Sequence, residues 1–321
     1  MLLSQISTGD AGSGNNPDLQ NLALNAIQAE APILGYLQFR AITGNSTTDR
    51  KDHQNNGAGE MRTVDNDYTP TITATPEVTS ALRIMGDKIK TDLSFERRYG
   101  AEGLGSERAR QLEKFSRSLG RHLTNIVMNG DNVAPNINGL KTVATGSQLL
   151  NFDTNNGGVV SLGSDNASKK QQQKFLAAID EAVANTVGAT AMMMDSKTIA
   201  RLKAIAREYV TVSQAVDAFG RQHEIVTYGG LPVIIAGFDS ANTTRVVPHN
   251  EVLGTSGAVC TSIYVAGFAE DELISYITNV GLVVKDLGLV GPHYTTLCEL
   301  DLNAQVYNDK AVTRLQGVII D

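Results

Sequence analysis

One amphipathic segment, residues 106–129, constrains the fold of this chain more than any other feature. Its apolar residues recur at steps of three and four, the spacing of a helix that buries one stripe. They are Leu112, Phe115, Leu119, Leu123 and Ile126. Ser106 can cap the start of such a helix, and Asn129-Gly130 can supply a left-handed stop. At 1.5 Å per residue the helix would be roughly 36 Å long, which is long for a globular domain.

Composition places the chain among ordinary globular proteins. With 321 residues, 41% of them hydrophobic and 19% charged, it can bury a sizeable core and is not disordered throughout. A formal charge of −7 gives no basic footprint for sequence-specific nucleic-acid binding, and the absence of Trp argues against a base-stacking platform. Cys260 and Cys298 lie in apolar surroundings and are predicted to be buried, reduced thiols, which fits a cytoplasmic folding compartment. We find neither a signal peptide nor a membrane span, so no membrane partner is expected.

The first third of the chain predicts an arm followed by a long hairpin. Residues 1–20 are rich in Ser, Gly, Asn and Asp, and the short apolar segment after them could dock on another surface. Residues 36–42 alternate as a strand, 44–59 are almost entirely polar, and 69–75 alternate again. Because such a hairpin has too few apolar residues for a core, it must stay in solvent or lie on a neighbouring molecule.

Beyond the long helix the pattern becomes mixed α/β. A helix is predicted over 168–187, followed by a buried strand over 191–194 whose three methionines are interpreted as core. Asp195 or Ser196 can cap a second helix. Further strands are predicted over 231–235, 263–266 and 273–277, and the tail alternates as two strands separated by a turn at Asn308-Asp309.

Two short motifs occur in an order and at a spacing that resemble a known family. Met128-Asn129-Gly130-Asp131 ends the long helix, Asn138-Gly139-Leu140 follows, and Thr296-Leu297-Cys298-Glu299 lies in a late strand. Together they resemble the major capsid proteins of tailed bacteriophages, which have the Hong Kong-phage capsid fold. The resemblance implies an α+β, or mixed α/β, architecture. Its expected parts are an N-terminal arm (1–35), an extended loop hairpin (36–82), a peripheral domain with the spine helix (83–135), an axial domain (136–290) and C-terminal strands of the peripheral domain (291–321).

The same resemblance implies a structural function. Copies of the chain would self-assemble, as hexamers and pentamers, into an icosahedral virion shell around double-stranded DNA that is held without sequence-specific contacts. Assembly would occur in the host cytoplasm with portal and decoration proteins as partners. Because the hairpin begins near Tyr36, any scaffolding protein is expected to be separate. An encapsulin-type nanocompartment shell and a soluble α/β enzyme remain the alternatives.

No catalytic, cofactor or metal site is expected. The five histidines have no metal-ligand spacing. Residues 100–105 read G-x-x-G-x-G and not the dinucleotide-binding order, so we interpret them as a hinge. Some members of the family join subunits through a Lys–Asn isopeptide bond. Here the Asn position is Pro292 and Lys51 is the hairpin's only lysine, so Glu299 is interpreted as structural and no crosslink is expected.

Charged residues of the hairpin and of the segment before the spine helix are the candidates for contacts between subunits. As an isolated run, such charges would be a solvated tip that contributes little energy; the capsid resemblance gives the interface interpretation equal weight. The candidates are Arg40, Asp49, Arg50, Lys51, Asp52, Arg62, Asp65, Arg97 and Arg98.

Overall fold

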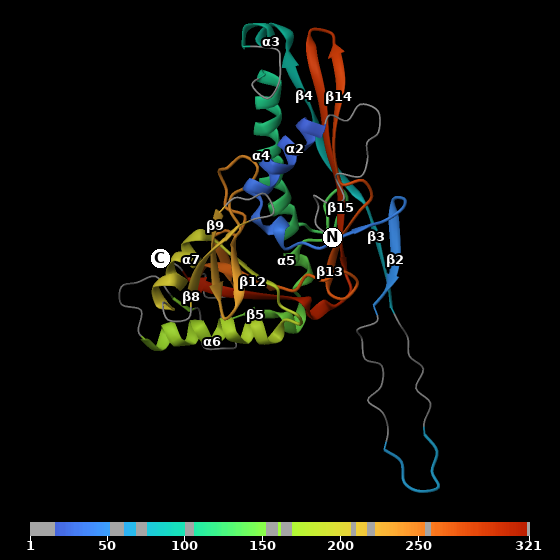
Figure 1. The fold of residues 1–321 in the computed structure, drawn as a ribbon. Helices are drawn as coiled ribbons and strands as arrows, with labels where there is room; N and C mark the ends of the chain where they lie inside the picture. Colours follow the sequence, from blue (N-terminus) through green and yellow to red (C-terminus); the bar gives the residue numbers. More distant parts are fainter. Residues whose placement is uncertain are drawn as a thin grey trace.

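The computed structural model describes residues 17–51, 61–68, 76–99, 106–151, 160–161, 169–206, 210–216, 222–253 and 258–319. These residues form a long blade, a broader sheet domain beside its base, and a hairpin that points away from both (Figure 1). The helices are α2 (Pro17–Glu30), η1 (Pro32–Gly35), α3 (Leu93–Tyr99), α4 (Glu107–Asn129), α5 (Leu140–Val143), η3 (Gly146–Gln148), α6 (Lys169–Asn185), α7 (Ser196–Ile205) and η4 (Asp309–Ala311). None of the helices in these ranges is long and apolar enough to cross a membrane.

The strands form two large sheets and one two-stranded ribbon. In chain order they are β1 (Phe39–Ala41), β2 (Ser46–Arg50), β3 (Glu77–Ala81), β4 (Arg83–Asp92), β5 (Leu149–Asn151), β6 (Val160–Ser161), β7 (Ala191–Met194), β8 (Val210–Val216), β9 (Gln222–Tyr228), β10 (Leu231–Ile235), β11 (Glu251–Leu253), β12 (Ala258–Ala266), β13 (Ile274–Thr278), β14 (Leu282–Val290), β15 (His293–Val306) and β16 (Val312–Ile319).

The predicted long helix is α4, and its start is confirmed. The Ser106 hydroxyl accepts a hydrogen bond from the Ala109 amide at 3.1 Å, which satisfies one of the free donors of the first turn. Leu112, Leu119 and Leu123 of the predicted stripe are buried in the core. This stripe packs α4 into one core with the blade and with α2.

The end of α4 differs from the prediction. Gly130 has φ −54° and is therefore not a left-handed stop. A glycine is required there by close approach, because a Cβ on Gly130 would lie 2.3 Å from the Ile137 carbonyl oxygen. A Cβ on Gly139 would likewise lie 2.3 Å from the Gly130 nitrogen. The two motif glycines thus bring two passes of the chain into contact, and the Gly139 amide donates to the Gly130 carbonyl at 3.1 Å.

The blade is a five-stranded sheet in the order β1-β13-β15-β14, with β4 on the other side of β15. The prediction that residues 36–42 form the first strand of the 36–82 hairpin is wrong, because β1 pairs in parallel with β13 and belongs to this sheet. Phe39 is fully buried, and its ring centroid lies 5.9 Å from that of Tyr276. The hairpin that leaves the body is therefore β2–β3. β13 and β14, which fall within the predicted axial range of 136–290, also lie in the blade.

The predicted outward arm (1–35) is wrong over the described residues 17–35, which fold back onto their own molecule. Ala23 and Ile27 of α2 are fully buried, and α2 packs along α4. The helices approach so closely that a Cβ on Gly120 would lie 2.6 Å from the Ile27 carbonyl oxygen. Glu30 at the end of α2 pairs with Arg121 of α4 at 2.9 Å. The apolar segment that, from the sequence, could dock on another surface is therefore α2, and it packs on the spine helix α4 of its own chain.

The second domain is a nine-stranded sheet whose main order is β5-β16-β12-β7-β10-β9-β8. Its central strand β7 is fully buried, as predicted. Met193 faces the core shared with the blade, whereas Met192 and Met194 face α6 and α7 on the opposite side. Burial on both faces explains why an uninterrupted apolar run is used here. Of the two strands in the predicted C-terminal range of 291–321, β16 lies next to β12 in this sheet, whereas β15 lies in the blade.

Asp195 caps α7 and also joins a polar cluster. Its side chain, 2% exposed, accepts a hydrogen bond from the Lys197 amide at 2.7 Å and contacts both Arg245 and His249. Burial alone would raise the pKa of Asp195. The Lys197 and Arg245 hydrogen bonds outweigh burial and lower that pKa below its usual range.

Both cysteines are buried, as predicted, and neither forms a disulfide. Burial, with a smaller effect of the neighbouring Glu299 carboxylate, raises the pKa of Cys298 to about 12. The thiol is therefore uncharged and unreactive at neutral pH.

Candidate intersubunit surfaces

The hairpin β2–β3 presents mostly polar side chains. Its two five-residue strands pair in antiparallel register from Ser46↔Ala81 to Arg50↔Glu77. Thr48 and Thr79 join across the strands through a 2.9 Å hydrogen bond between their hydroxyls. Ser80 is the one buried residue in the two strands. A two-stranded ribbon of this composition gains little from burial within its own subunit.

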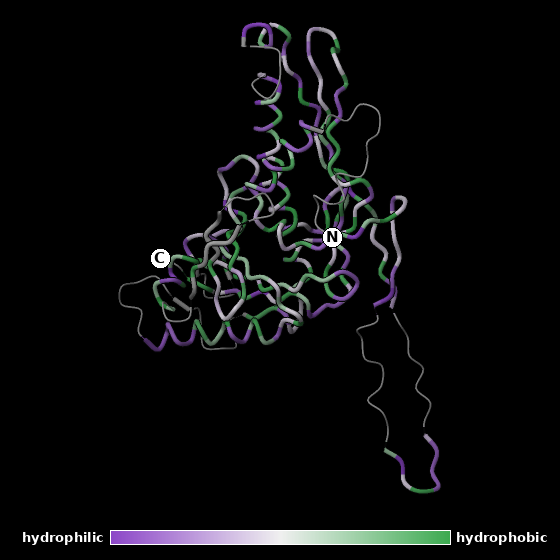
Figure 2. Tube along the Cα trace, viewed as in Figure 1, coloured by the Kyte–Doolittle hydropathy of each residue, from purple (hydrophilic) through white to green (hydrophobic). Residues whose placement is uncertain are grey.

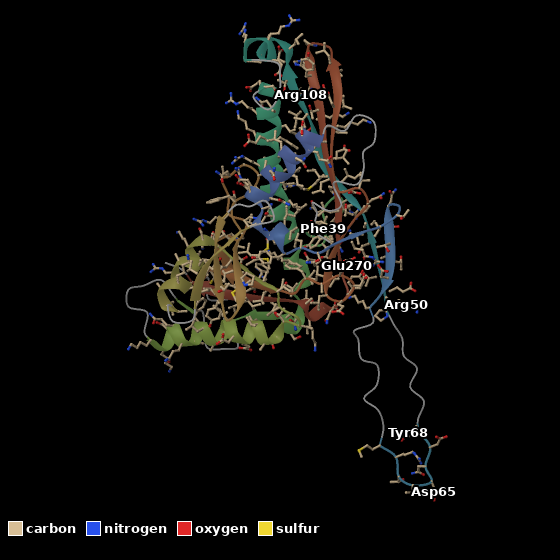
Figure 3. The ribbon with its side chains drawn as sticks, in the orientation of Figure 1. Phe39, Arg50, Asp65, Tyr68, Arg108 and Glu270 are labelled. Carbon is tan, nitrogen blue, oxygen red and sulfur yellow. The ribbon has the colours of Figure 1, made fainter. Side chains whose placement is uncertain are left out.

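The described tip of the hairpin, residues 61–68, carries apolar side chains far from the body (Figure 3). Met61 is 100% exposed, Val64 88% and Tyr68 55%. Figure 2 shows hydrophobic residues interspersed with hydrophilic ones at this tip. Arg62 lies over the Tyr68 ring at 5.3 Å, and Asp65 adopts φ 73° in the turn. Exposed apolar groups gathered on a projecting loop favour contact with another molecule.

At the base of the hairpin, Asp49 of β2 meets three donors from the body. Its carboxylate accepts hydrogen bonds from Arg40 at 2.8 Å, from Gln305 at 2.8 Å and from the Tyr307 hydroxyl at 3.3 Å. Burial would raise the pKa of Asp49, but the hydrogen bonds from Arg40 and Gln305 outweigh it and lower the pKa. Arg40 also contacts Asp271 at 2.9 Å. We call Arg40, Asp49, Asp271, Gln305 and Tyr307 the base cluster.

A second set of contacts ties the hairpin to the body beside the base cluster. The Lys51 ammonium pairs with Asp309 of η4 at 2.7 Å. On the other strand, the Ser80 hydroxyl donates to the Ala304 carbonyl at 3.4 Å, and the Asn303 amide donates to the Ala81 carbonyl at 2.7 Å. Both hairpin strands are therefore fixed to the region around the end of β15.

The predicted interface candidates divide into two groups. Arg40, Asp49 and Lys51 make ion pairs within their own chain, so they are placed to orient the hairpin. The remaining described candidates are exposed, at the hairpin, on its tip or on α3. They are Arg50, Arg62, Asp65, Arg97 and Arg98. Asp52 lies outside the described residues.

The far end of the blade holds residues that the sequence did not single out. Arg108, in the first turn of α4, donates to Thr296 at 2.8 Å and pairs with Asp286 at 2.6 Å. The hydrogen bond from Arg108 lowers the pKa of Asp286. In the sequence, the only indication of this contact was a positively charged residue just after the predicted start of the helix.

Near Arg108, three apolar side chains expose 50–58% of their surface and form a second exposed apolar surface. They are Phe95, Leu289 and Val290.

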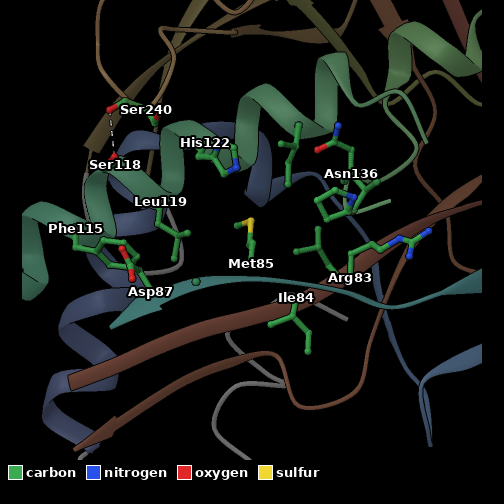
Figure 4. A pocket seen from close by; sticks show the side chains of 15 residues that line it. Arg83, Ile84, Met85, Asp87, Phe115, Ser118, Leu119, His122, Asn136 and Ser240 are labelled. Carbon is green, nitrogen blue, oxygen red and sulfur yellow. Dashed lines mark hydrogen bonds between the residues drawn. The ribbon is translucent and has the colours of Figure 1, made fainter. Parts of the chain in front are cut away.

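A groove of about 440 Å³ lies between α4 and β4 (Figure 4). Phe115 and Leu119 of the helix and Met85 of the strand line it, and the Ser118 hydroxyl at its rim donates to the Ser240 carbonyl at 3.1 Å. His122 is exposed at the groove, as expected for the polar side of the helix. Among the described side chains, no group of three or more His, Cys, Asp or Glu residues could hold a metal ion. The groove is lined by both polar and apolar side chains.

The fold matches solved shell structures, whereas no protein-family model and no curated protein sequence matches the chain. The holo-SrpI encapsulin complex from Synechococcus elongatus contains a chain that is 13% identical at a TM-score of 0.58, covering 99% of this chain and 95% of that one. The capsid of the native GTA particle gives 16% identity and a TM-score of 0.57, covering 89% of each chain. A chain of Mycobacterium phage Bobi gives 10% identity and a TM-score of 0.57, covering 98% of this chain and 94% of that one. The chain therefore has the mixed α/β fold of phage capsid and encapsulin shell proteins, the Hong Kong-phage capsid fold that its motifs resemble.

Proposed function

We propose that this chain is the major capsid protein of a tailed bacteriophage and that its copies assemble into a closed icosahedral shell. The observation that carries the proposal is the hairpin, whose tip exposes Met61, Val64 and Tyr68 at the end farthest from the body. A monomer gains nothing from holding these side chains in water. A neighbouring copy that covered them would gain about 1.5–3 kcal/mol for each apolar side chain fully buried.

The mechanism of assembly is repetition of modest contacts. The tip and the exposed end of the blade are different surfaces, so a contact between them is heterologous, and rotation about an axis can close it into rings. Such rings would be the hexamers and pentamers of the shell. Each subunit then makes several contacts at once, and their combined avidity keeps the closed shell together.

The proposal includes no catalytic role and no cofactor. The shell would enclose double-stranded DNA by confinement, which agrees with a formal charge of −7 and needs no sequence-specific site. Portal, decoration and scaffolding proteins are the further expected partners. The expected location is the virion capsid, formed in the host cytoplasm.

Sedimentation and electron microscopy of the purified protein test shell formation. We expect closed particles of megadalton mass, formed from the chain alone or with the scaffolding protein of its source. A persistent monomer or small oligomer under both conditions would contradict the proposal.

An encapsulin-type shell is the second candidate, favoured by the likeness to the holo-SrpI encapsulin over 99% of this chain. The contents of particles purified from the natural source separate the two functions. A phage capsid carries nuclease-protected double-stranded DNA, whereas a nanocompartment carries a cargo protein. Protected DNA supports our proposal, and a stoichiometric protein cargo without DNA supports the alternative.

A further inference from the structure

The direction of the hairpin is set by polar contacts at its base. The first strand is held through Asp49 of β2 and Lys51 just after it, and β3 is held through Ser80 and Ala81. The body residues that contact the hairpin come from separate elements: β1, the end of β15 and η4. A ribbon that is fixed along both strands has a defined direction as well as a defined point of attachment.

Among the ion pairs at the base of the hairpin, Arg40–Asp49 is the best shielded from water. Their side chains are 28% and 23% exposed, whereas Asp271 and Asp309, at the outer contacts, are 60% and 61% exposed. Charge-assisted hydrogen bonds are stronger than neutral ones and keep their strength where water is partly excluded. Asp49 is also where β1, β15 and Tyr307 converge on the hairpin. The inner pair therefore contributes most to holding the ribbon.

A small rotation at the base becomes a large displacement at the tip. The chain from Arg50 to Asp65 can span at most about 50 Å, so a rotation of about 10° at the base moves the tip by at most roughly 9 Å. Such a displacement is comparable to the distance between packed helices and would carry the tip side chains away from a neighbouring surface. Contacts at the tip thus depend on the geometry of the base.

We propose that Asp49 and Arg40 are positioning residues that fix the angle of the hairpin to the body and thereby determine the curvature and diameter of the shell. This inference rests on the proposed shell function. The hairpin contacts a second copy of this chain, and the position of that copy depends on the hairpin angle. The pair acts through the hairpin and lies away from the tip, so it need not touch that copy.

Asp49→Asn tests the inference because it keeps the size of the side chain but removes the charge that Arg40 requires. Asp49→Glu keeps the charge and serves as the conservative variant. Glu113→Gln is the matched control, since it removes the carboxylate of an exposed Arg117 pair on α4, 2.9 Å long. Particle diameters are measured by electron microscopy. Amide hydrogen exchange over residues 76–81 is measured on dissociated subunits, with urea unfolding as a check on the body.

We expect Asp49→Asn subunits to unfold at the same urea midpoint as the control, with exchange over 76–81 faster by roughly tenfold, the factor expected for one lost charge-assisted hydrogen bond. Their particles should show a diameter distribution at least about twice as broad, and Asp49→Glu should narrow it again. Asp49→Asn particles with wild-type diameters and wild-type exchange would overturn the inference while leaving shell formation intact. A lowered urea midpoint with unchanged exchange over 76–81 would also overturn it, by showing a purely structural role. If the wild type forms no particles, the proposed function fails, and the exchange measurement still decides whether the pair holds the hairpin.

Discussion

At the scale of single residues, the junction after the spine helix leaves no room for a side chain. Gly130 faces the carbonyl oxygens of Ile137 and Ile126, and a Cβ would lie 2.3 and 2.6 Å from them. Both contacts are with backbone atoms, which cannot rotate away. The motif glycines are therefore needed for close packing. Gly130 has a negative φ, so it is not needed there for a left-handed conformation.

Gly130→Ala should lower the free energy of unfolding by at least about 2 kcal/mol, because the backbone must shift to accept the methyl group. Gly35→Ala is the matched control, since nothing lies within 4 Å of a Cβ at that position, and its effect should stay within about 0.5 kcal/mol. Urea unfolding of dissociated subunits gives both values. Equal effects of the two substitutions would show that the junction relaxes freely.

Asp195 is a second position where one side chain serves several groups. Asp195→Ala removes the cap of α7 and leaves Arg245 without its carboxylate, so we expect a loss of about 2–4 kcal/mol. Asp195→Asn keeps an acceptor for the Lys197 amide and should lose less. Because the folded pKa is lowered, the stabilisation by the charge is complete above the unfolded pKa of about 3.9 and is lost as the pH falls through the folded value.

Urea unfolding between pH 3 and pH 8 checks this pH dependence. The difference in stability between wild type and Asp195→Asn should shrink as the pH falls below about pH 4. A difference that grew on acidification would contradict the assigned role of the carboxylate.

At the scale of elements, local patterns predicted the parts of the fold whose determinants lie close together in the sequence. The apolar stripe and the Ser106 cap gave the start of α4, and the methionine run gave the buried strand β7. Asp195 was one of two caps considered for α7, and the structure selects it. In each case the signal and the element occupy the same short stretch of chain.

Elements defined by distant partners were missed. The alternation of residues 36–42 is equally compatible with a hairpin strand and with β1, and only the parallel partner β13 decides between them. The apolar residues of α2 could not reveal that their partner is α4 of the same chain. The candidate site shows the same limit, since charge alone did not reveal that Arg40 and Asp49 pair within the subunit.

The hairpin can be tested as an element. Replacing residues 52–75 with an Asn-Gly turn keeps β2, β3 and the base cluster and removes the tip. The circular dichroism spectrum and the urea midpoint should stay within error of the wild type, because the tip side chains are exposed. Particle yield should fall at least about tenfold. Global unfolding of this variant would mean that the hairpin stabilises its own subunit.

At the scale of the whole molecule, the two domains share one continuous core. β15 lies in the blade and β16 in the nine-stranded sheet, and only η4 and a short turn separate them. The face of the nine-stranded sheet that carries Met193 packs into the same cluster as α4 and α2. The body is therefore expected to move as one unit, and the hairpin is the described part that extends beyond it (Figure 1).

A cryo-electron microscopy map of assembled particles that resolves residues 61–68 tests whether the hairpin joins neighbouring subunits. We predict that this tip lies on an adjacent copy, with Met61, Val64 and Tyr68 covered by that copy's side chains. A map in which the tip folds back onto its own body, or remains uncovered in a closed shell, would show that the hairpin does not build the shell.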